Sequence, residues 1–327
     1  MEEAKLTQTP IKITPVTRSR VHEVDFENVP FGKVFSDHMF SADYEDGKWK
    51  NARITPFDNI SFAPSISGLH YGQLIFEGMK AFKDIHGNGL LFRPEMNMRR
   101  FNVSAHRMAM PEVPESLFRE GLYKLLQMDS DWIPPNPGAS LYIRPFMFAT
   151  DEYVGIRPSE QYRFMIFTCP VGPYYSSPVK VKVAERYVRA FKGGTGYAKA
   201  AGNYGATLRP VIEAHQEGYH QILWLDGEDF KYVQEIGTMN VFFVIGDKVI
   251  TPSTETGEIL KGITRDSAIT ILRDKGYEVE DRPIEIAEVV DAARSGDLMD
   301  AFGAGTAATI AHIPSSGTRM KSWYCLR

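Results

Sequence analysis

Cysteine is scarce in this sequence, which also has no long hydrophobic run and no excess of basic residues. Its two cysteines, Cys169 and Cys325, cannot build a disulfide framework, so we expect a reducing compartment, the cytoplasm. No apolar run approaches the ~20 residues of a membrane-spanning helix, and the polar start MEEAKLTQTPIKIT lacks a signal-peptide core. The formal net charge of -4 offers no basic surface to nucleic acid. We therefore expect a cytoplasmic protein with no nucleic-acid or membrane partner.

Metal-ligand spacing is also missing. The eight histidines are scattered, and His215 and His220, five residues apart, would not share a helical face well, so we expect no metal site. The composition is that of an ordinary globular protein, with 43% hydrophobic and 24% charged residues. A length of 327 residues predicts one large or two medium domains.

A segment rich in proline, glycine and serine divides the chain. Residues 173–180, within VGPYYSSPVK, predict a linker between a small N-terminal domain (1–172) and a larger domain (181–327). In the first domain, short apolar runs over residues 31–92 predict strands, and residues 96–128 have helical spacing.

The second half mixes strand-like runs with three helical patterns, at residues 205–218, 264–276 and 284–296. Strands and helices cluster without the regular alternation of a doubly wound sheet, so an α+β class is favoured. Gly276 is a plausible end signal for the second of these helices.

One lysine stands in an unusually bare setting. In GGTGYAKAAGNYGAT, no other charged residue lies between Lys192 and Arg209 around Lys199. A Walker phosphate loop would need GK followed by Ser or Thr, and Lys199 lies between alanines. An amine packed among small residues loses hydration, which disfavours its charged form and suits a nucleophile. Taken alone, the segment fits a surface lysine in a flexible loop better than a nucleophile.

Other features could accompany a nucleophilic lysine. Tyr204, in GNYG, would lie about one turn away if a helix begins there. Glu235, in QEIGTMN, could keep a pyridine nitrogen protonated, although it also fits a solvated hairpin carboxylate. The amides of Ile263 and Thr264 would suit a phosphate if they open a helix, which would otherwise be an ordinary helix start. The turn FGAGTAAT offers further amides for a carboxylate or a phosphate.

Six motifs, in this order, carry a family resemblance. FEGMKAF, FRPEMNMRR, SLYIRP, a lysine followed by GNYG, EIGTMN and FGAGTA resemble the branched-chain amino acid aminotransferases, which are pyridoxal-phosphate enzymes of fold type IV. The match runs from about Phe31 to His312. The resemblance implies a two-domain α+β fold with a smaller α/β N-terminal domain, a larger domain with a barrel-like sheet, and an active site at the domain interface.

The resemblance also implies roles for individual residues. Lys199 would form the Schiff base with pyridoxal 5'-phosphate, Tyr204 would hydrogen-bond the cofactor's 3-oxygen, and Glu235 would pair with the pyridine nitrogen. The phosphate would be bound by Arg100, Ile263, Thr264 and Thr306, while the neighbouring Arg99 would be a surface residue. Whether Thr306 serves the phosphate or the substrate carboxylate is open.

The substrate side follows from the same resemblance. The α-carboxylate would be received by Thr306, Ala307, Tyr71 and Thr238. The aromatic wall would comprise Phe31, Tyr71, Phe76, Tyr142 and Tyr174, although Phe76 fits plain core packing equally well. Arg144 would bind the distal carboxylate of glutamate, and Val154 and Ile156 would reach the pocket of a partner subunit in a homodimer.

The implied reaction is reversible transfer of the amino group of leucine, isoleucine or valine to 2-oxoglutarate, with Lys199 moving the Cα proton. Two departures from the family stand out. Ala308 and Ala311 occupy the positions where some members have a redox pair of cysteines, and the chain after His312 is polar and irregular and looks truncated or altered. Cys169 is expected to be a buried small hydrophobe.

Two alternatives are open. Another fold type IV enzyme, such as a D-amino-acid aminotransferase or an aminodeoxychorismate lyase, would share Lys199 and Glu235 but not the whole motif set. A catalytically silent relative that acts as a scaffold would not need Lys199, Tyr204, Glu235 and Arg100 together.

Overall fold

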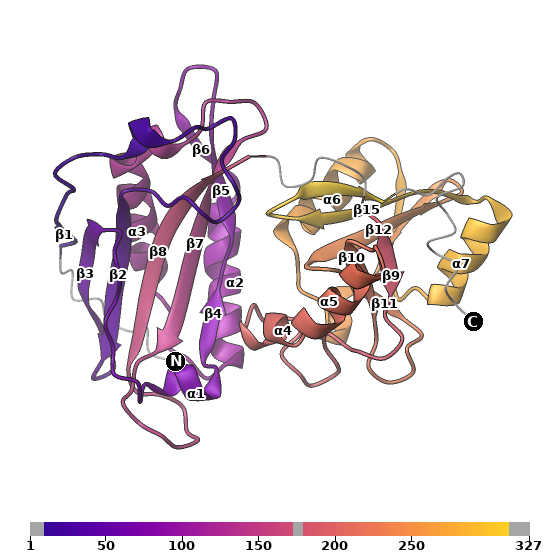
Figure 1. Ribbon diagram of the computed structural model, residues 1–327. Coiled ribbons are helices and arrows are strands. Elements are labelled where there is room, and N and C mark those ends of the chain that lie inside the picture. Colours follow the sequence, from indigo (N-terminus) through magenta and orange to yellow (C-terminus); the bar gives the residue numbers. More distant parts are fainter. Residues whose placement is uncertain (1–9, 173–178, 314–327) are drawn as a thin grey trace. The chain divides into compact units, whose positions relative to one another are not determined.

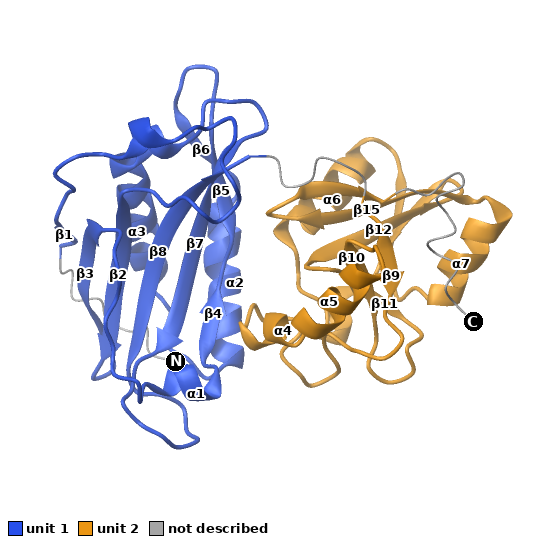
Figure 2. Ribbon diagram, in the orientation of Figure 1, with its two compact units in different colours: residues 1–174 blue, residues 175–327 orange. Residues whose placement is uncertain are grey.

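The computed structural model describes residues 10–172 and 179–313, and the chain divides into two compact units, residues 1–174 and 175–327 (Figure 2). Most of the expected linker, with Tyr174, lies outside the described residues, as does nearly all of the tail after His312. The domain limits inferred from the sequence therefore stay predictions.

Unit 1 is built mainly from strands. Its two long helices come between the sixth and seventh strands in the sequence (Figure 1). Its elements are β1 (Lys12–Ile13), η1 (Val21–Glu23), β2 (His38–Glu45), β3 (Lys48–Pro56), α1 (Ser67–Tyr71), β4 (Leu74–Phe76), β5 (Met79–Lys83), β6 (Gly89–Leu91), α2 (Pro94–Arg107), α3 (Glu115–Met128), η2 (Ser130–Trp132), β7 (Ser140–Ala149) and β8 (Tyr162–Val171).

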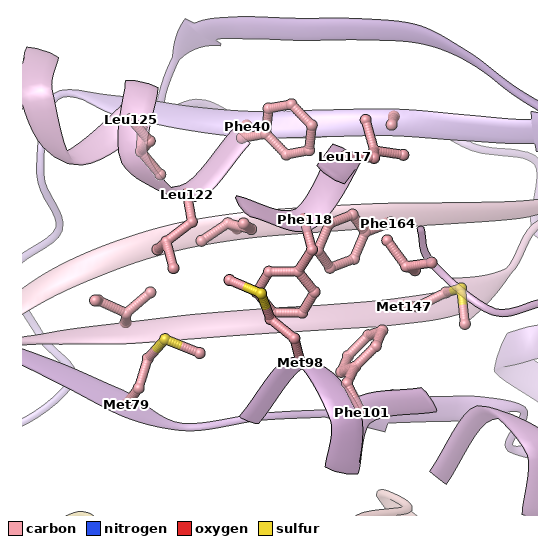
Figure 3. Packing of buried hydrophobic residues seen from close by; sticks show 14 of the residues in the cluster. Phe40, Met79, Met98, Phe101, Leu117, Phe118, Leu122, Leu125, Met147 and Phe164 are labelled. Atoms are coloured by element: carbon pink, nitrogen blue, oxygen red, sulfur yellow. The ribbon is translucent and has the colours of Figure 1, made fainter. Parts of the chain in front are cut away.

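The sheet of unit 1 has the strand order β1-β3-β2-β8-β7-β5-β6, with β4 also paired to β7. Every pair is antiparallel except β1 with β3. Helices α2 and α3 bury their apolar stripes against it, so that Phe101 and Phe118 meet Phe164 of β8 in the core (Figure 3). This packing fixes the helix that carries Arg100 on the sheet.

Unit 2 alternates strands and helices more often (Figure 1). Its elements are β9 (Val181–Val183), α4 (Gly202–Gly205), α5 (Leu208–Gln216), β10 (Gln221–Leu225), β11 (Val233–Ile236), β12 (Met239–Ile245), β13 (Lys248–Thr251), η3 (Thr254–Thr256), α6 (Ile263–Asp274), β14 (Glu278–Asp281), α7 (Ile286–Ser295), β15 (Leu298–Gly305) and β16 (Thr309–Ile313).

The sheet of unit 2 has the order β14-β13-β12-β11-β10-β9, and β15 pairs with both β12 and β16. Side chains of a strand alternate between its two faces, and β12 shows this directly. Val241 and Phe243 pack in one cluster with Val289 of α7, while Phe242 packs in another with Ile269 of α6. Helices α6 and α7 therefore cover opposite faces of this sheet, which sets where the N-terminus of α6 lies.

The α+β class expected from the sequence is confirmed, because both sheets are mixed and mostly antiparallel. Gly276 follows α6 with a φ of 86°, a backbone conformation that glycine adopts without strain, as expected at the end of that helix. The short helix α1 and strand β16 were not expected from the sequence. Within the described part of the chain, no helix is long and apolar enough to cross a membrane.

Gly121 offers a test of this packing. A Cβ at this position of α3 would lie 2.7 Å from the ring of the fully buried Phe40. Alanine favours helix over glycine by about 1 kcal/mol, but overpacking a core costs about 1–3 kcal/mol. We expect Gly121→Ala to lower the free energy of unfolding in chemical denaturation. In a Phe40→Leu background the same change should be harmless or stabilising, and equal losses in both backgrounds would contradict the steric explanation.

Candidate functional site

Lys199 lies immediately before the short helix α4, and its amine is already paired. Nζ of Lys199 donates a hydrogen bond of 2.9 Å to the phenol oxygen of Tyr204 and lies 5.3 Å from the centroid of that ring. Both side chains are half-buried. Helix α4 begins at Gly202, so the turn that brings the phenol back to the amine forms as the sequence suggested. The amine and the phenol can therefore share a proton across one contact.

The loop that carries Lys199 is held by Asn203, a residue to which the sequence analysis gave no role. The Nδ2 amide of Asn203 donates to the carbonyls of Thr195 and Ala198, at 2.8 Å each. Its Oδ1 accepts a 2.6 Å hydrogen bond from the hydroxyl of Thr195. All of these contacts are uncharged, so Asn203 fixes the lysine loop without itself adding a charge.

Glu235 is buried, with 4% of its surface exposed, and is not a solvated hairpin carboxylate. Its Oε1 accepts a 2.8 Å hydrogen bond from the main-chain N–H of Leu260. Its Oε2 lies 3.5 Å from Nε of Arg189, which has a side chain only 7% exposed. A buried carboxylate is costly unless it is paired and hydrogen-bonded, and Glu235 has one main-chain donor and one nearby buried cation.

Arg189 connects three segments of unit 2. Its guanidinium donates to the main-chain carbonyls of Gly196, in the lysine loop, and of Glu258, while Nε faces Glu235. A Cβ on Gly196 would overlap the Glu258 carbonyl, so only glycine lets the loop lie this close. Lys199 and Glu235 are thus brought into one region of unit 2 through a single buried cation.

Glu258 adds a second buried carboxylate. Gln234 donates a 2.9 Å hydrogen bond to it, and burial raises the pKa of Glu258 above its usual range. This side chain is therefore more easily protonated than an exposed glutamate.

The N-terminus of α6 supplies main-chain donors. Gly262 is the N-cap and has no side chain with which to cap the first turn. The first N–H groups of a helix lack intrahelical partners, and the helix dipole adds partial positive charge there. The amides of Ile263 and Thr264 lie in this first turn, so the helix start expected at these residues is present in the fold.

The turn between β15 and β16 contains Thr306 and Ala307, both half-buried, and the pair Gly305–Thr309 closes it. Two residues earlier, Ala304 lies opposite Asn240 in the β12–β15 ladder. Thr238 is exposed in the tight turn between β11 and β12, where Gly237 has a φ of 56°. The two turns lie at the same end of the paired strands β12 and β15.

Arg100 is half-buried in unit 1 and is paired with Glu77. Its Nε and Nη2 donate to the two carboxylate oxygens of Glu77 at 2.7 and 2.9 Å. Asn97 and the main-chain N–H of Gly78 also donate to Glu77, which is completely buried. A bidentate pair of this kind fixes the plane of the guanidinium. The neighbouring Arg99 is exposed, as expected.

An aromatic cluster surrounds Arg144 in unit 1. Nη2 of Arg144 donates to the hydroxyl of Tyr142 at 3.0 Å, and its guanidinium lies 4.7 Å from the ring centroid of Phe76. Phe31 meets Tyr142 edge-on at 5.3 Å. Phe76 therefore packs beneath a cation, which goes beyond the plain core packing that its sequence also allowed. Opposite Tyr142 in the sheet lies the buried Cys169, and burial raises the pKa of its thiol to about 11.

Three further predicted residues are exposed in unit 1. Tyr71 is 42% exposed, Val154 is 66% exposed and Ile156 is 92% exposed. Within the described residues of unit 1 they are not brought together with the cluster around Arg144. Tyr174 lies outside the described residues.

Five residues of these sites were missed by the sequence analysis. They are Glu77, Asn97, Arg189, Asn203 and Asn240. All but Arg189 lie within the motifs that carry the family resemblance. The sequence therefore showed these residues but not the contacts that they make. No group of three or more histidine, cysteine or acidic side chains that could hold a metal ion occurs in residues 10–172 and 179–313.

The pairing of Arg100 with Glu77 predicts a large effect of a small change. We expect Glu77→Gln to lower the free energy of unfolding by about 3–5 kcal/mol, because it leaves the side chain of Arg100 without its carboxylate partner. Glu45, which pairs with Lys50 at 2.6 Å on the surface, provides the matched control. Glu45→Gln should cost about 1 kcal/mol or less in the same chemical denaturation series. Similar losses in the two variants would show that Glu77 does not hold Arg100.

Comparisons with known proteins identify the family of the chain. The model of the amino-transferase class IV family matches residues 74–303. A probable branched-chain-amino-acid aminotransferase of Staphylococcus epidermidis is 47% identical over 294 residues, which cover 88% of this chain and 82% of the relative. Branched-chain-amino-acid aminotransferase 2 of Bacillus subtilis is 44% identical and covers 94% of this chain and 85% of its own length.

Solved structures give the same result. The branched-chain amino acid aminotransferase of Escherichia coli superposes with a TM-score of 0.69 at 25% identity, covering 85% of each chain. A second branched-chain amino acid aminotransferase, from the organism abbreviated T.th., was solved with pyridoxamine 5'-phosphate. It has a TM-score of 0.67 at 25% identity and covers 83% of this chain and 84% of its own. The chain therefore belongs to the class IV aminotransferase family.

Proposed function

We propose that this protein is a branched-chain amino acid aminotransferase that uses pyridoxal 5'-phosphate. The family is established, relatives at 44–47% identity carry this activity in their names, and one solved relative is described with the pyridoxamine form of the cofactor. The observation that carries the proposal is the contact of Lys199 with Tyr204, in the same unit as the buried carboxylate of Glu235.

The described residues fit such a cofactor. Lys199 offers an amine next to a phenol, and Glu235 retains Oε2, which no main-chain N–H occupies within the described residues. The start of α6 offers amides that no N-cap side chain covers. An aldehyde, a pyridine nitrogen and a phosphate each find a group of suitable chemistry. We assign Arg100, Thr264, Ile263 and Thr306 to the phosphate, as the family resemblance suggests.

When bound, pyridoxal phosphate supplies a ring that takes up the negative charge left at Cα as its proton is removed. Lys199 Nζ holds the cofactor and moves the Cα proton. The hydroxyl of Tyr204 orients that amine and shares its proton. Glu235 holds a proton on the ring nitrogen, with Arg189 and the Leu260 N–H stabilising its charge. The amino group of leucine, isoleucine or valine passes to 2-oxoglutarate, and glutamate and a branched 2-oxo acid are formed.

On the substrate side, we assign the aromatic cluster of Phe31, Phe76 and Tyr142 to the apolar side chain and Arg144 to the distal carboxylate of glutamate. A guanidinium lying over Phe76 can serve both kinds of substrate, since it lies over apolar surface and still offers donors. The Nε of Arg144 is buried and has no hydrogen-bond partner among the described residues. Tyr71, Thr238 and the amide of Ala307 are assigned to the α-carboxylate, which Thr306 would serve as the alternative to the phosphate.

Lys199→Ala tests the assignment most directly. The purified protein should be yellow with bound cofactor and should lose that colour with leucine, whereas the variant should lose the covalently held cofactor and at least about 10²-fold in kcat. Lys192→Ala is the matched control, because Lys192 lies in the same segment with its side chain 62% exposed. Colour retained in Lys199→Ala would contradict the assignment. Loss of colour with D-alanine but not with leucine would favour a D-amino-acid enzyme.

We also infer a cytoplasmic homodimer in which Val154 and Ile156 of each subunit reach the pocket of the partner subunit. The support is the family resemblance, together with their exposure of 66% and 92%, which leaves both side chains accessible to a partner subunit.

Ile156→Ala tests this assembly. The protein should sediment at about twice the chain mass of 36.9 kDa. The variant should raise the KM for leucine about tenfold with little change in cofactor binding, because it removes apolar contact to the substrate side chain. Ile85→Ala is the control, since Ile85 is 95% exposed in unit 1 and has no assigned role. The inference would be contradicted if the wild-type protein sedimented as a monomer and if Ile156→Ala, like Ile85→Ala, left the KM for leucine unchanged.

A further inference from the structure

The main chain of Leu260 is held on both sides by two side chains of the sheet in unit 2. Its N–H donates to Oε1 of Glu235 at 2.8 Å, and its carbonyl accepts a 2.9 Å hydrogen bond from Nδ2 of Asn240. Glu235 and Asn240 lie opposite one another in the β11–β12 ladder. One rung of the sheet therefore fixes the segment that leads into α6.

Asn240 also determines the path of the chain two residues later. Gly262 passes so close that a Cβ there would overlap Oδ1 of Asn240. Asn240 is only 5% exposed, so its amide has little freedom to turn away. The N-cap of α6 thus lies against the same side chain that holds Leu260, and the amides of Ile263 and Thr264 follow directly from it.

The same residue adjoins the third part of the site. Across the sheet on its other side, Asn240 lies opposite Ala304 of β15, two residues before Thr306. The carboxylate assigned to the ring nitrogen, the helix start assigned to the phosphate and the turn that contains Thr306 therefore all border one asparagine.

We propose that Asn240 is a positioning residue that sets the separation between Glu235 and the N-terminus of α6. A cofactor with a ring nitrogen at one end and a phosphate at the other would need this separation to be fixed. The inference rests on the proposed function, because it takes Glu235 and α6 as the two ends of the cofactor site. Asn240 does not itself contact the reacting atoms.

Asn240→Ala removes the donor to the Leu260 carbonyl, and Asn240→Asp replaces that donor with an acceptor at nearly constant volume. Gly262→Ala pushes the segment away from the opposite side. Thr251→Val is the matched control, because Thr251 is fully buried on the neighbouring strand β13 and donates to the carbonyl of Val241, apart from the Leu260 segment.

The readout is binding, measured by fluorescence titration with pyridoxal phosphate and, separately, with pyridoxal, which lacks the phosphate. We expect Asn240→Ala, Asn240→Asp and Gly262→Ala to weaken pyridoxal phosphate binding by about 10- to 100-fold, because a main-chain carbonyl loses its donor or the helix start moves. Pyridoxal binding should change far less. Thr251→Val should leave the ratio of the two affinities unchanged, even if it lowers the melting temperature.

A merely structural role of Asn240 would lower stability and weaken both ligands in proportion. An unchanged ratio of affinities in the Asn240 and Gly262 variants that remain folded, judged by circular dichroism, would overturn the proposal. If the wild-type protein showed no preference for pyridoxal phosphate over pyridoxal, the proposed function itself would fail. The phosphorus NMR shift of bound pyridoxal phosphate, expected to move in the Asn240 variants and not in Thr251→Val, gives a second readout that does not depend on turnover.

Discussion

The burial of Glu235 is the constraint on which the arrangement of unit 2 depends. A carboxylate that is 4% exposed is tolerated only if donors surround it, and its donors come from outside its own hairpin. Leu260 supplies a main-chain N–H from the segment before α6, and Arg189 supplies a guanidinium from the segment before the lysine loop. Satisfying one buried charge therefore draws together the two loops that the chemistry needs.

Unit 1 also contains a buried carboxylate that is surrounded by donors. Glu77 is completely buried and is surrounded by donors from Arg100, Asn97 and its neighbour Gly78. In unit 1 the cation, Arg100, is itself assigned to the cofactor phosphate, and the carboxylate of Glu77 fixes the orientation of its guanidinium. In both units a buried acid is paired with an arginine, through charge-assisted hydrogen bonds to Arg100 in unit 1 and through an ion pair of 3.5 Å with Arg189 in unit 2. The residues that hold these side chains in place must therefore be of a particular type, as must the residues assigned to the chemistry.

Local patterns in the sequence predicted the elements well, because helical spacing and glycine end signals act within a few residues. Helices α2, α3, α6 and α7 and the end of α6 at Gly276 follow from such patterns. The short helix α1 has one turn and no apolar period, and β16 depends on pairing with β15, so neither could be inferred locally.

The candidate site was predictable in its residue types and not in its contacts. Lys199 and Tyr204 are five residues apart, so a single turn of helix sufficed to predict that they lie close together, although not that they form a hydrogen bond. Asn240 and Leu260 are separated by 20 residues, and Arg189 and Glu258 by 69, so their contacts depend on the register of the sheet. The local sequence around Glu235 also allowed a solvated hairpin carboxylate, and only its place on a central strand shows that it is buried.

The bare setting of Lys199 has a physical explanation in these contacts. Its loop must be rigid enough to aim an amine, yet an acidic side chain bonded to the amine would hold it in its charged form. Asn203 makes the loop rigid through three uncharged hydrogen bonds. Arg189 donates to the carbonyl of Gly196 in the same loop, and its Nε faces Glu235. Gly196 allows the loop to lie against the main chain of Glu258. The lack of charged residues beside Lys199 in the sequence is therefore compatible with a fixed loop, because the amide of Asn203 and the guanidinium of Arg189 hold it.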